Sequence, residues 1–175
     1  MSATKKLLVI TIVIIGSAMM RTTAPAAEVG EPSITNSWRG ITPLRSSAAD
    51  VARVVGADAD EAALLSGPFR MDDGEVTFSY LTPSLAKIYR APAALVGKVF
   101  TIYFKPGQSI GRTELKLGAG FKRCVEERDR AFYYMINDAG VAYQLTRDSD
   151  RVETIIYQPS RAEVRRLAVN TDCVF

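Results

Sequence analysis

Histidine is the most informative absence from this sequence, because none of the 175 residues is a histidine. Without an imidazole, no Ser-His-Asp or Cys-His catalytic pair can form, and the commonest protein ligand of zinc is missing. We therefore predict no catalytic residues, no cofactor and no metal site.

The first 26 residues have the composition of an export signal. Two lysines precede an apolar run over residues 7–20, and the small residues 24–26 follow it. The apolar run is shorter than the roughly 20 residues that a membrane-spanning helix needs. We predict cleavage after Ala26, with Ala18 as the alternative, no stable membrane span, and a secreted or periplasmic location. An uncleaved anchor is the second interpretation.

Cysteine is scarce, because only Cys124 and Cys173 occur in the chain. Export places a chain in an oxidising compartment, where cysteines form disulfides. A bridge would close a loop of 50 residues, and the chain-entropy model assigns such a loop about 4 kcal/mol of stability. We predict that Cys124 and Cys173 are bridged, and the alternative is two buried free thiols.

No charge of one sign dominates once the predicted signal is removed. Residues 1–26 hold three of the 22 basic residues and none of the 19 acidic ones, so the remainder is formally neutral. A general attraction to nucleic acid is therefore not expected. Charge is still uneven, since residues 45–75 contain three basic and seven acidic residues, whereas residues 87–123 contain eight basic and one acidic. The basic segment is either an anion-binding surface or one of two solvated, mutually attractive faces.

Residues 38–56, WRGITPLRSSAADVARVVG, predict a helix start rather than an active-site loop. Ser46 or Ser47 can cap the helix, and Asp50 lies three residues beyond Ser47 as in a capping box. Three valines then recur at helical spacing, and Gly56 is a typical end signal. With no histidine to activate them, the serines are expected to cap rather than to catalyse.

The remaining pattern changes from helical spacing to strand alternation. The predicted elements are a second short helix over 58–65, strands over 75–81 and 98–104 with a helical turn over 84–89 between them, three strands within 131–158, and a capped helix over 160–169. The fold class is therefore α+β, with short N-terminal helices and a C-terminal helix packed on one face of a roughly five-stranded antiparallel sheet that ends in a three-stranded meander. We predict a flexible lead over 27–37 and a single domain over 38–175.

Three motifs are spread along the chain before the terminal Cys173, and each occurs once: WRGITPLRS at 38–46, ELKL at 114–117 and IYQPS at 156–160. Together they resemble a family of uncharacterised exported bacterial proteins of the acidobacterial type, and that resemblance implies no activity. More distantly, a G-I-x-P-L helix start followed by a meander is similar to the fold of beta-lactamase inhibitory protein and of the small lipoprotein of the outer-membrane assembly machine. Those folds imply helices on one side of an antiparallel sheet and protein binding, although this chain lacks the lipoprotein's attachment cysteine.

Three functions follow from these observations, in order of preference. The first is a non-enzymatic module of the cell envelope or secretome that binds a protein or another envelope component through an exposed aromatic sheet face. Its candidate contacts are Trp38, Arg39, Tyr103 and Tyr133. The second is binding of anionic envelope polymers through the basic segment, with candidate residues Lys87, Arg90, Lys98, Lys105, Arg112 and Lys116. The third is a hydrolase, which would need carboxylate or serine–lysine chemistry in a cleft.

Overall fold

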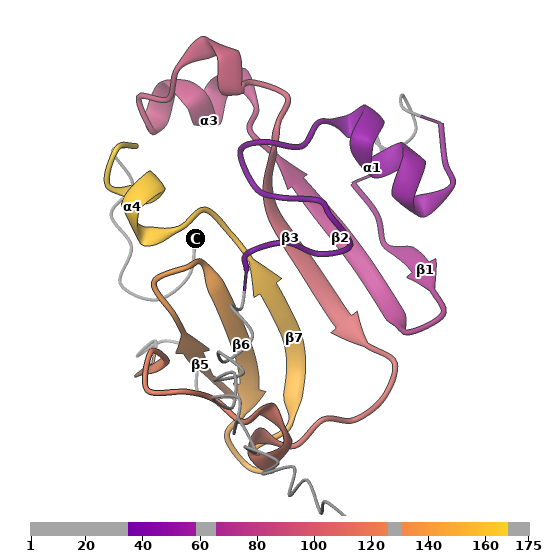
Figure 1. The fold of residues 1–175 in the computed structure, drawn as a ribbon, viewed down its shortest axis with the longest axis vertical. Coiled ribbons are helices and arrows are strands. Elements are labelled where there is room, and N and C mark those ends of the chain that lie inside the picture. Colours follow the sequence, from indigo (N-terminus) through magenta and orange to yellow (C-terminus); the bar gives the residue numbers. More distant parts are fainter. Residues whose placement is uncertain (1–34, 59–65, 126–130, 168–175) are drawn as a thin grey trace, which may run out of the picture. The chain divides into compact units, whose positions relative to one another are not determined.

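A seven-stranded antiparallel sheet forms the centre of the residues that the computed structural model describes, 35–58, 66–125 and 131–167 (Figure 1). The strands are β1 (Phe69–Met71), β2 (Gly74–Tyr80), β3 (Val99–Pro106), β4 (Lys122–Cys124), β5 (Phe132–Ile136), β6 (Val141–Thr146) and β7 (Val152–Tyr157). They lie side by side in the order β1-β2-β3-β7-β6-β5-β4. The helical elements are α1 (Ala48–Val55), α3 (Pro83–Ile88), α4 (Arg161–Val164) and the 3-10 turns η1 (Ala93–Leu95) and η2 (Arg112–Leu115).

Several predicted features lie outside the described residues. They are the signal peptide, most of the flexible lead, residues 59–65 of the second predicted helix, and Cys173. Cys124 ends β4 and is half-buried. The Cys124–Cys173 disulfide therefore stays a prediction.

The mixed helix–strand class and the antiparallel sheet are confirmed, but the predicted number of strands is wrong. The described part of the chain has seven strands rather than about five. The two unpredicted strands, β1 and β4, contain three residues each and form the two edges of the sheet. Three residues are too few to show the alternation from which a strand is predicted.

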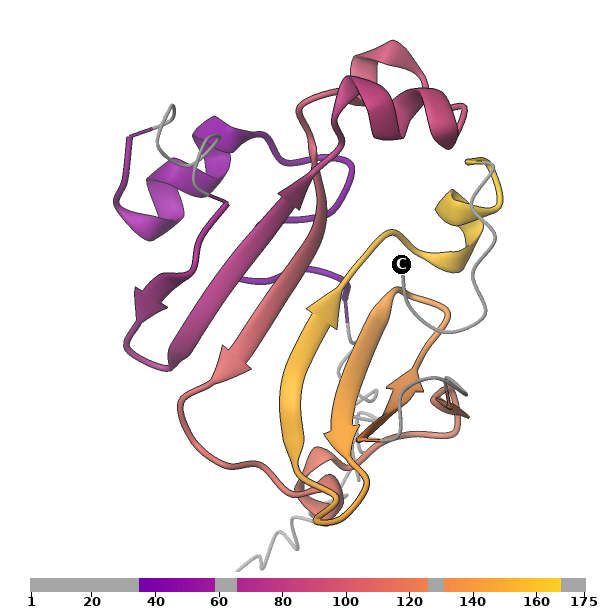
Figure 2. The same cartoon turned by 180° about the vertical axis from the view of Figure 1, so that it is seen from behind.

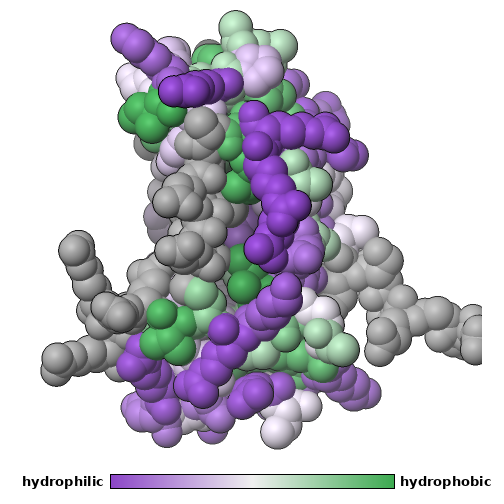
Figure 3. Space-filling view, turned by 90° about the vertical axis from the view of Figure 1, so that its left-hand side faces the viewer, coloured by the Kyte–Doolittle hydropathy of each residue, from purple (hydrophilic) through white to green (hydrophobic). Residues whose placement is uncertain are grey.

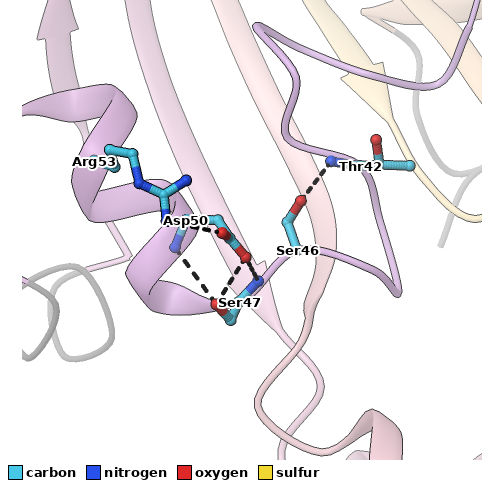
Figure 4. A network of polar contacts seen from close by, with 5 residues as sticks. All are labelled: Thr42, Ser46, Ser47, Asp50 and Arg53. Atoms are coloured by element: carbon cyan, nitrogen blue, oxygen red, sulfur yellow. Dashed lines mark hydrogen bonds and ion pairs between the residues drawn. The ribbon is translucent and has the colours of Figure 1, made fainter.

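Helix α1 begins as its sequence predicts, at a reciprocal capping box (Figure 4). The N–H of Ser47 donates to Oδ2 of Asp50 over 2.8 Å, and the N–H of Asp50 donates to Oγ of Ser47 over 3.4 Å. The hydrogen bond from the Ser47 backbone lowers the pKa of Asp50 below its ordinary value. Gly56 ends the helix at φ 73°, a left-handed conformation that glycine adopts without a steric penalty.

The second serine of this tract has a different partner. Oγ of Ser46 accepts the N–H of Thr42 over 3.0 Å and so closes the turn that precedes the helix (Figure 4). Ser46 is also 9% exposed, which places it among the buried polar residues. Both serines therefore have structural hydrogen bonds.

The predicted meander is formed by β5, β6 and β7, which pair in sequence order. At its first turn the side chain of Asn137 accepts the N–H of Val141 over 2.9 Å. Gly140 lies there at φ 96°, against the backbone carbonyls of Gln158 and Pro159. A side chain at this position would meet those carbonyls, so the turn requires glycine. The pairing of β7 with β3 joins the meander to β1, β2 and β3, and the pairing of β5 with β4 adds the other edge strand.

Two hydrophobic clusters cover different strands on one face of the sheet. The first packs α1 and the 38–41 turn against β2 and β3 and contains Trp38, Ile41, Val51, Ala52, Val76, Phe78, Val99, Ile102 and Phe104. The second lies on β5, β6 and β7 and contains Tyr133, Met135, Leu145 and Val152, with the apolar residues of the 110–121 segment packed against it. The segment between β3 and β4 therefore covers this face of the meander.

The prediction that the C-terminal helix, α4, packs on one face of the sheet is wrong, and no face was predicted for α3. These two helices lie beyond one end of the sheet, as the two opposite views show (Figures 1 and 2). A third cluster accounts for their position, because Leu81 and Phe100 at that end pack with Ala86 of α3 and with Leu167 after α4. Within the described residues helix α4 has four residues, and its Ser160–Glu163 capping box is present, whereas residues 168–169 of the predicted helix lie outside the described part of the chain.

Candidate anion-binding site

Two of the four candidate partner contacts are buried in the domain. Trp38 is 4% exposed and lies edge-on to Phe78 with 5.8 Å between ring centroids. Tyr133 is 1% exposed. Neither ring is available to a partner in this conformation, which corrects the expectation of exposed aromatic contacts at both positions. Alternation alone did not reveal that both faces of the sheet are partly covered.

The other two candidates are more accessible. Tyr103 is half-buried beside a small cluster of Tyr134, Ala142 and Ile156. The Arg39 guanidinium lies 5.2 Å from the centre of the Trp38 ring and forms an ion pair with Asp73 over 2.9 Å. Neither residue lies in the larger hollow described below.

The six candidate cations of the basic segment do not form one surface. Lys87 and Arg90 lie on or next to α3, and Lys98 immediately precedes β3 at the same end of the sheet. Lys105 is paired with Glu153, with Nζ 2.7 Å from Oε1. Arg112 and Lys116 lie in and beside η2, which Figure 1 places at the opposite end of the sheet from α3. The structure thus divides the six candidates, with Lys87, Arg90 and Lys98 at one end of the sheet and Arg112 and Lys116 together at the other.

Arg112 and Lys116 line a cavity of about 590 Å³, which we call the η2 hollow. Its wall combines cationic, apolar and hydroxyl groups. The lining residues on which its chemistry depends are Arg112, Lys116, Leu117, Phe121, Met135 and Asp150. Its volume is within the usual range for pockets that bind small ligands.

Backbone hydrogen bonds fix the rim of the η2 hollow to the turn between β6 and β7. The N–H of Arg112 donates to the carbonyl of Asp150 over 3.0 Å, and the N–H of Val152 donates to the carbonyl of Ile110 over 2.9 Å. The position of Arg112 is therefore set by the sheet, although its side chain is exposed.

Two residues of this rim have an uncommon backbone conformation for residues other than glycine. Lys116 has φ 45° and Asp150 has φ 51°. Left-handed residues with side chains are sparse in proteins and cost free energy that surrounding contacts must offset. Both residues line the same hollow. Backbone strain of this kind is found often at functional sites.

A hydrogen bond links the buried Tyr133 to Asp150, which lines the hollow. The Tyr133 hydroxyl donates to Oδ1 of Asp150 over 2.6 Å, and the guanidinium of Arg123 lies 4.5 Å from the centre of the Tyr133 ring. Burial, followed by the bond to Asp150, raises the pKa of Tyr133, while the positive charges of Arg112 and Arg123 partly oppose that rise. Tyr133 therefore stays a neutral donor at physiological pH.

The two cations of the η2 hollow have no acidic partner in the described part of the chain. None of the ion pairs between described residues involves Arg112 or Lys116. The nearby acids have other bonds, since Glu114 accepts the N–H of Gly111 over 2.8 Å and Asp150 accepts the hydroxyl of Tyr133. The hollow thus offers positive charge to a ligand.

A second, smaller hollow of about 360 Å³ lies beside α1 and differs in this respect. Three arginines line it, but each has an acidic partner. The pairs are Arg39 with Asp73 at 2.9 Å, Arg45 with Glu163 at 3.8 Å, and Arg53 with Asp50 at 3.4 Å. Its charges are already compensated, so it is the weaker candidate.

The described residues define an α+β domain whose antiparallel sheet carries a basic hollow at one end. Within them no helix has both the length and the apolar composition to cross a membrane, and no group of three potential metal ligands occurs. A comparison of the chain with protein-family models, curated proteins and solved structures finds no match. The family resemblance expected from the motifs therefore stays a prediction.

Sequence reasoning found Arg112 and Lys116 but missed the residues that surround them. Phe121, Met135 and Asp150 are separated from η2 by up to 35 residues, and they join it only because the 110–121 segment folds back over the meander. Asp150 carried one usable signal, its position in a charged turn between two alternating runs.

Proposed function

We propose that this protein is a non-enzymatic, exported binding module that holds anionic envelope polymers in the η2 hollow. The observation that carries the proposal is the pair Arg112 and Lys116, two exposed cations without an acidic partner among the described residues, on a hollow of about 590 Å³. The predicted signal sequence and the predicted Cys124–Cys173 bridge support a secreted or periplasmic location.

The chemistry of the lining suits a carboxylate or phosphate group attached to a larger chain. A guanidinium can bind an oxyanion with two parallel hydrogen bonds, and the lysine ammonium adds a point charge. Leu117, Phe121 and Met135 provide apolar surface for the ligand's carbon skeleton. Asp150 can accept a hydrogen bond from a ligand hydroxyl, because Tyr133 occupies only part of the capacity of its carboxylate.

Binding rather than catalysis is proposed because Asp150 is the single carboxylate among the described residues that line the hollow. A general acid–base pair would need a second titratable group within hydrogen-bond reach of the same ligand atom. The positive charges of Arg112 and Lys116 suit recognition of an anion.

The test measures binding of a fluorescently labelled oligogalacturonate, a carboxylate polymer, and of polyphosphate to the full chain by anisotropy and competition. We expect at least one to bind and to weaken steeply with added salt, because exposed charges are screened. The double variant Arg112→Gln with Lys116→Gln should weaken binding about tenfold, the effect of one hydrogen bond to a charged group.

A matched variant removes the same charge elsewhere. Lys87→Gln with Arg90→Gln lies at the other end of the sheet and should leave binding of the labelled polymer unchanged. Equal weakening by the two double variants, or no binding of either polymer, would overturn the proposal.

A further inference from the structure

The connection between β2 and β3 projects beyond the end of the sheet and carries α3 and η1 (Figures 1 and 2). We call residues 82–97 the α3–η1 tip. Its two ends are joined at the sheet, since the N–H of Gly97 donates to the carbonyl of Leu81 over 2.9 Å and the N–H of Leu81 donates to the carbonyl of Lys98 over 2.8 Å. The tip is therefore a long connection within the β2–β3 hairpin, and backbone hydrogen bonds close its base.

The inner side of the tip is firmly packed. Ala86 is 6% exposed and lies in the cluster formed by Leu81 and Phe100, and the ring of Tyr89 stacks on Phe100 with 5.4 Å between centroids. These inward contacts already fill the space beneath α3. The side chains on the outer side consequently have no core to enter.

The outer side of the tip combines exposed apolar and cationic side chains. Three large hydrophobic side chains are exposed in the described part of the chain, and two belong to the tip, Ile88 at 65% and Val96 at 37%. Lys87 and Arg90 lie on either side of Ile88 in the sequence and are exposed. At the top of Figure 3, the end formed by α3 and η1, hydrophobic and strongly hydrophilic side chains lie next to one another.

This surface also lacks acidic side chains of its own. No aspartate or glutamate occurs in the sequence between Glu75 and Glu114, although this stretch contains five basic residues. A solvated protein surface normally carries both signs of charge. An apolar projection flanked only by cations is instead complementary to a surface that is negatively charged outside and apolar within.

We propose that the α3–η1 tip docks on an anionic lipid surface. Ile88 and Val96 enter the boundary between headgroups and acyl chains, while Lys87 and Arg90 bind lipid phosphates and Lys98 adds charge at the base. The site is separate from the η2 hollow, so the two proposals fail independently. Docking of this kind is peripheral and reversible, because two apolar side chains bury little area.

The first experiment places a fluorescent reporter in the tip of the full chain. Trp38 is the native tryptophan and is 4% exposed, so its emission should not respond to lipid. The variant Ile88→Trp should shift to the blue and be quenched by brominated lipid when vesicles of phosphatidylcholine with one quarter phosphatidylglycerol are added. The control Val125→Trp uses the third exposed hydrophobic position, outside the tip, and should show neither change.

The second experiment removes the charge. In the Ile88→Trp background, adding Lys87→Gln with Arg90→Gln should weaken the apparent affinity for these vesicles about tenfold or more, given the contribution of each cation near an anionic surface. Adding Arg112→Gln with Lys116→Gln to the same background should leave the apparent affinity for the vesicles unchanged. All variants share the apolar run over residues 7–20, so only the site-specific signals decide. No blue shift at position 88, equal quenching at positions 88 and 125, or equal effects of the two double variants would overturn the proposal.

Discussion

The hydroxyl of Tyr133 donates a 2.6 Å hydrogen bond to Oδ1 of Asp150, which links the middle of the meander to the rim of the η2 hollow. The carbonyl oxygen of the same aspartate accepts the N–H of Arg112, so one residue connects a buried ring to a cation that lines the hollow. Through Asp150, the packing of Tyr133 in β5 helps to fix the position of the Arg112 backbone.

Removal of that hydroxyl should destabilise the domain and loosen the hollow. We expect Tyr133→Phe to cost about 1 kcal/mol of unfolding free energy, the usual worth of a hydrogen bond in a partly solvated setting. The measurement is urea unfolding followed by circular dichroism. Tyr143→Phe serves as the control, because no hydrogen bond of its hydroxyl is present among the described residues, and equal losses in both variants would contradict the assigned link.

The two serines before α1 predict an effect on stability. Ser47→Ala removes one half of the capping box with Asp50 and should cost about 1 kcal/mol. Ser84→Ala, an exposed serine of α3 outside its N-cap position, should change stability by less than about 0.5 kcal/mol. Replacing both Ser46 and Ser47 with alanine should lower the melting temperature without changing the affinity for an anionic polymer. Lost binding with unchanged stability would instead return this tract to the functional residues.

Tyr80 predicts an alkaline weakness of the fold. Its buried hydroxyl has no hydrogen-bond partner in the described part of the chain, and burial raises its pKa from 10.0 to about 12. A raised folded-state pKa means that stability is fully present below pH 10 and is lost as pH rises towards 12. Tyr80→Phe should therefore lose less stability over that interval.

The same variant has an expected effect at neutral pH. Because the hydroxyl makes no compensating bond, Tyr80→Phe should stabilise the domain by up to about 1 kcal/mol. Unfolding curves at pH 7 and pH 11 compare the two proteins, and absorbance at 295 nm follows tyrosinate formation. A large destabilisation by phenylalanine at pH 7 would show that the hydroxyl has a partner after all.

The predicted Cys124–Cys173 bridge has a direct chemical readout. The full chain, unfolded without reductant, should show no reactive thiol, and adding reductant should lower its unfolding free energy by up to about 4 kcal/mol. A variant with both cysteines replaced by serine should be insensitive to reductant. Two titratable thiols per unreduced chain would contradict the bridge.

Local signals in the sequence predicted the elements whose determinants are local. The Ser47–Asp50 capping box, the glycine ends at Gly56 and Gly140, and the alternation of β5 to β7 all depend on residues close in the chain. The edge strands and the position of α3 and α4 depend on contacts between distant segments, such as Leu44 and Leu167 in one cluster with Phe100. Periodicity carries no information about such contacts.

Local sequence signals likewise placed some of the candidate binding residues correctly and not others. Tyr133 was expected on an exposed aromatic face of the sheet, yet it is buried because the 110–121 segment folds over it. The acid-poor segment did indicate where cations gather. It gave no means of separating those near α3 from those near η2, because that separation is made by the full length of β3 between them.

The short strands at both edges of the sheet also bear on how the protein behaves at high concentration. An open edge with unpaired backbone groups is a template for strand addition and fibril growth. The outermost strands of the described sheet, β1 and β4, have three residues each, and they present the exposed side chains of Arg70 and of Lys122 and Arg123. A second chain would find few backbone groups to pair with and positive charge beside them, so this architecture resists aggregation through its sheet edges.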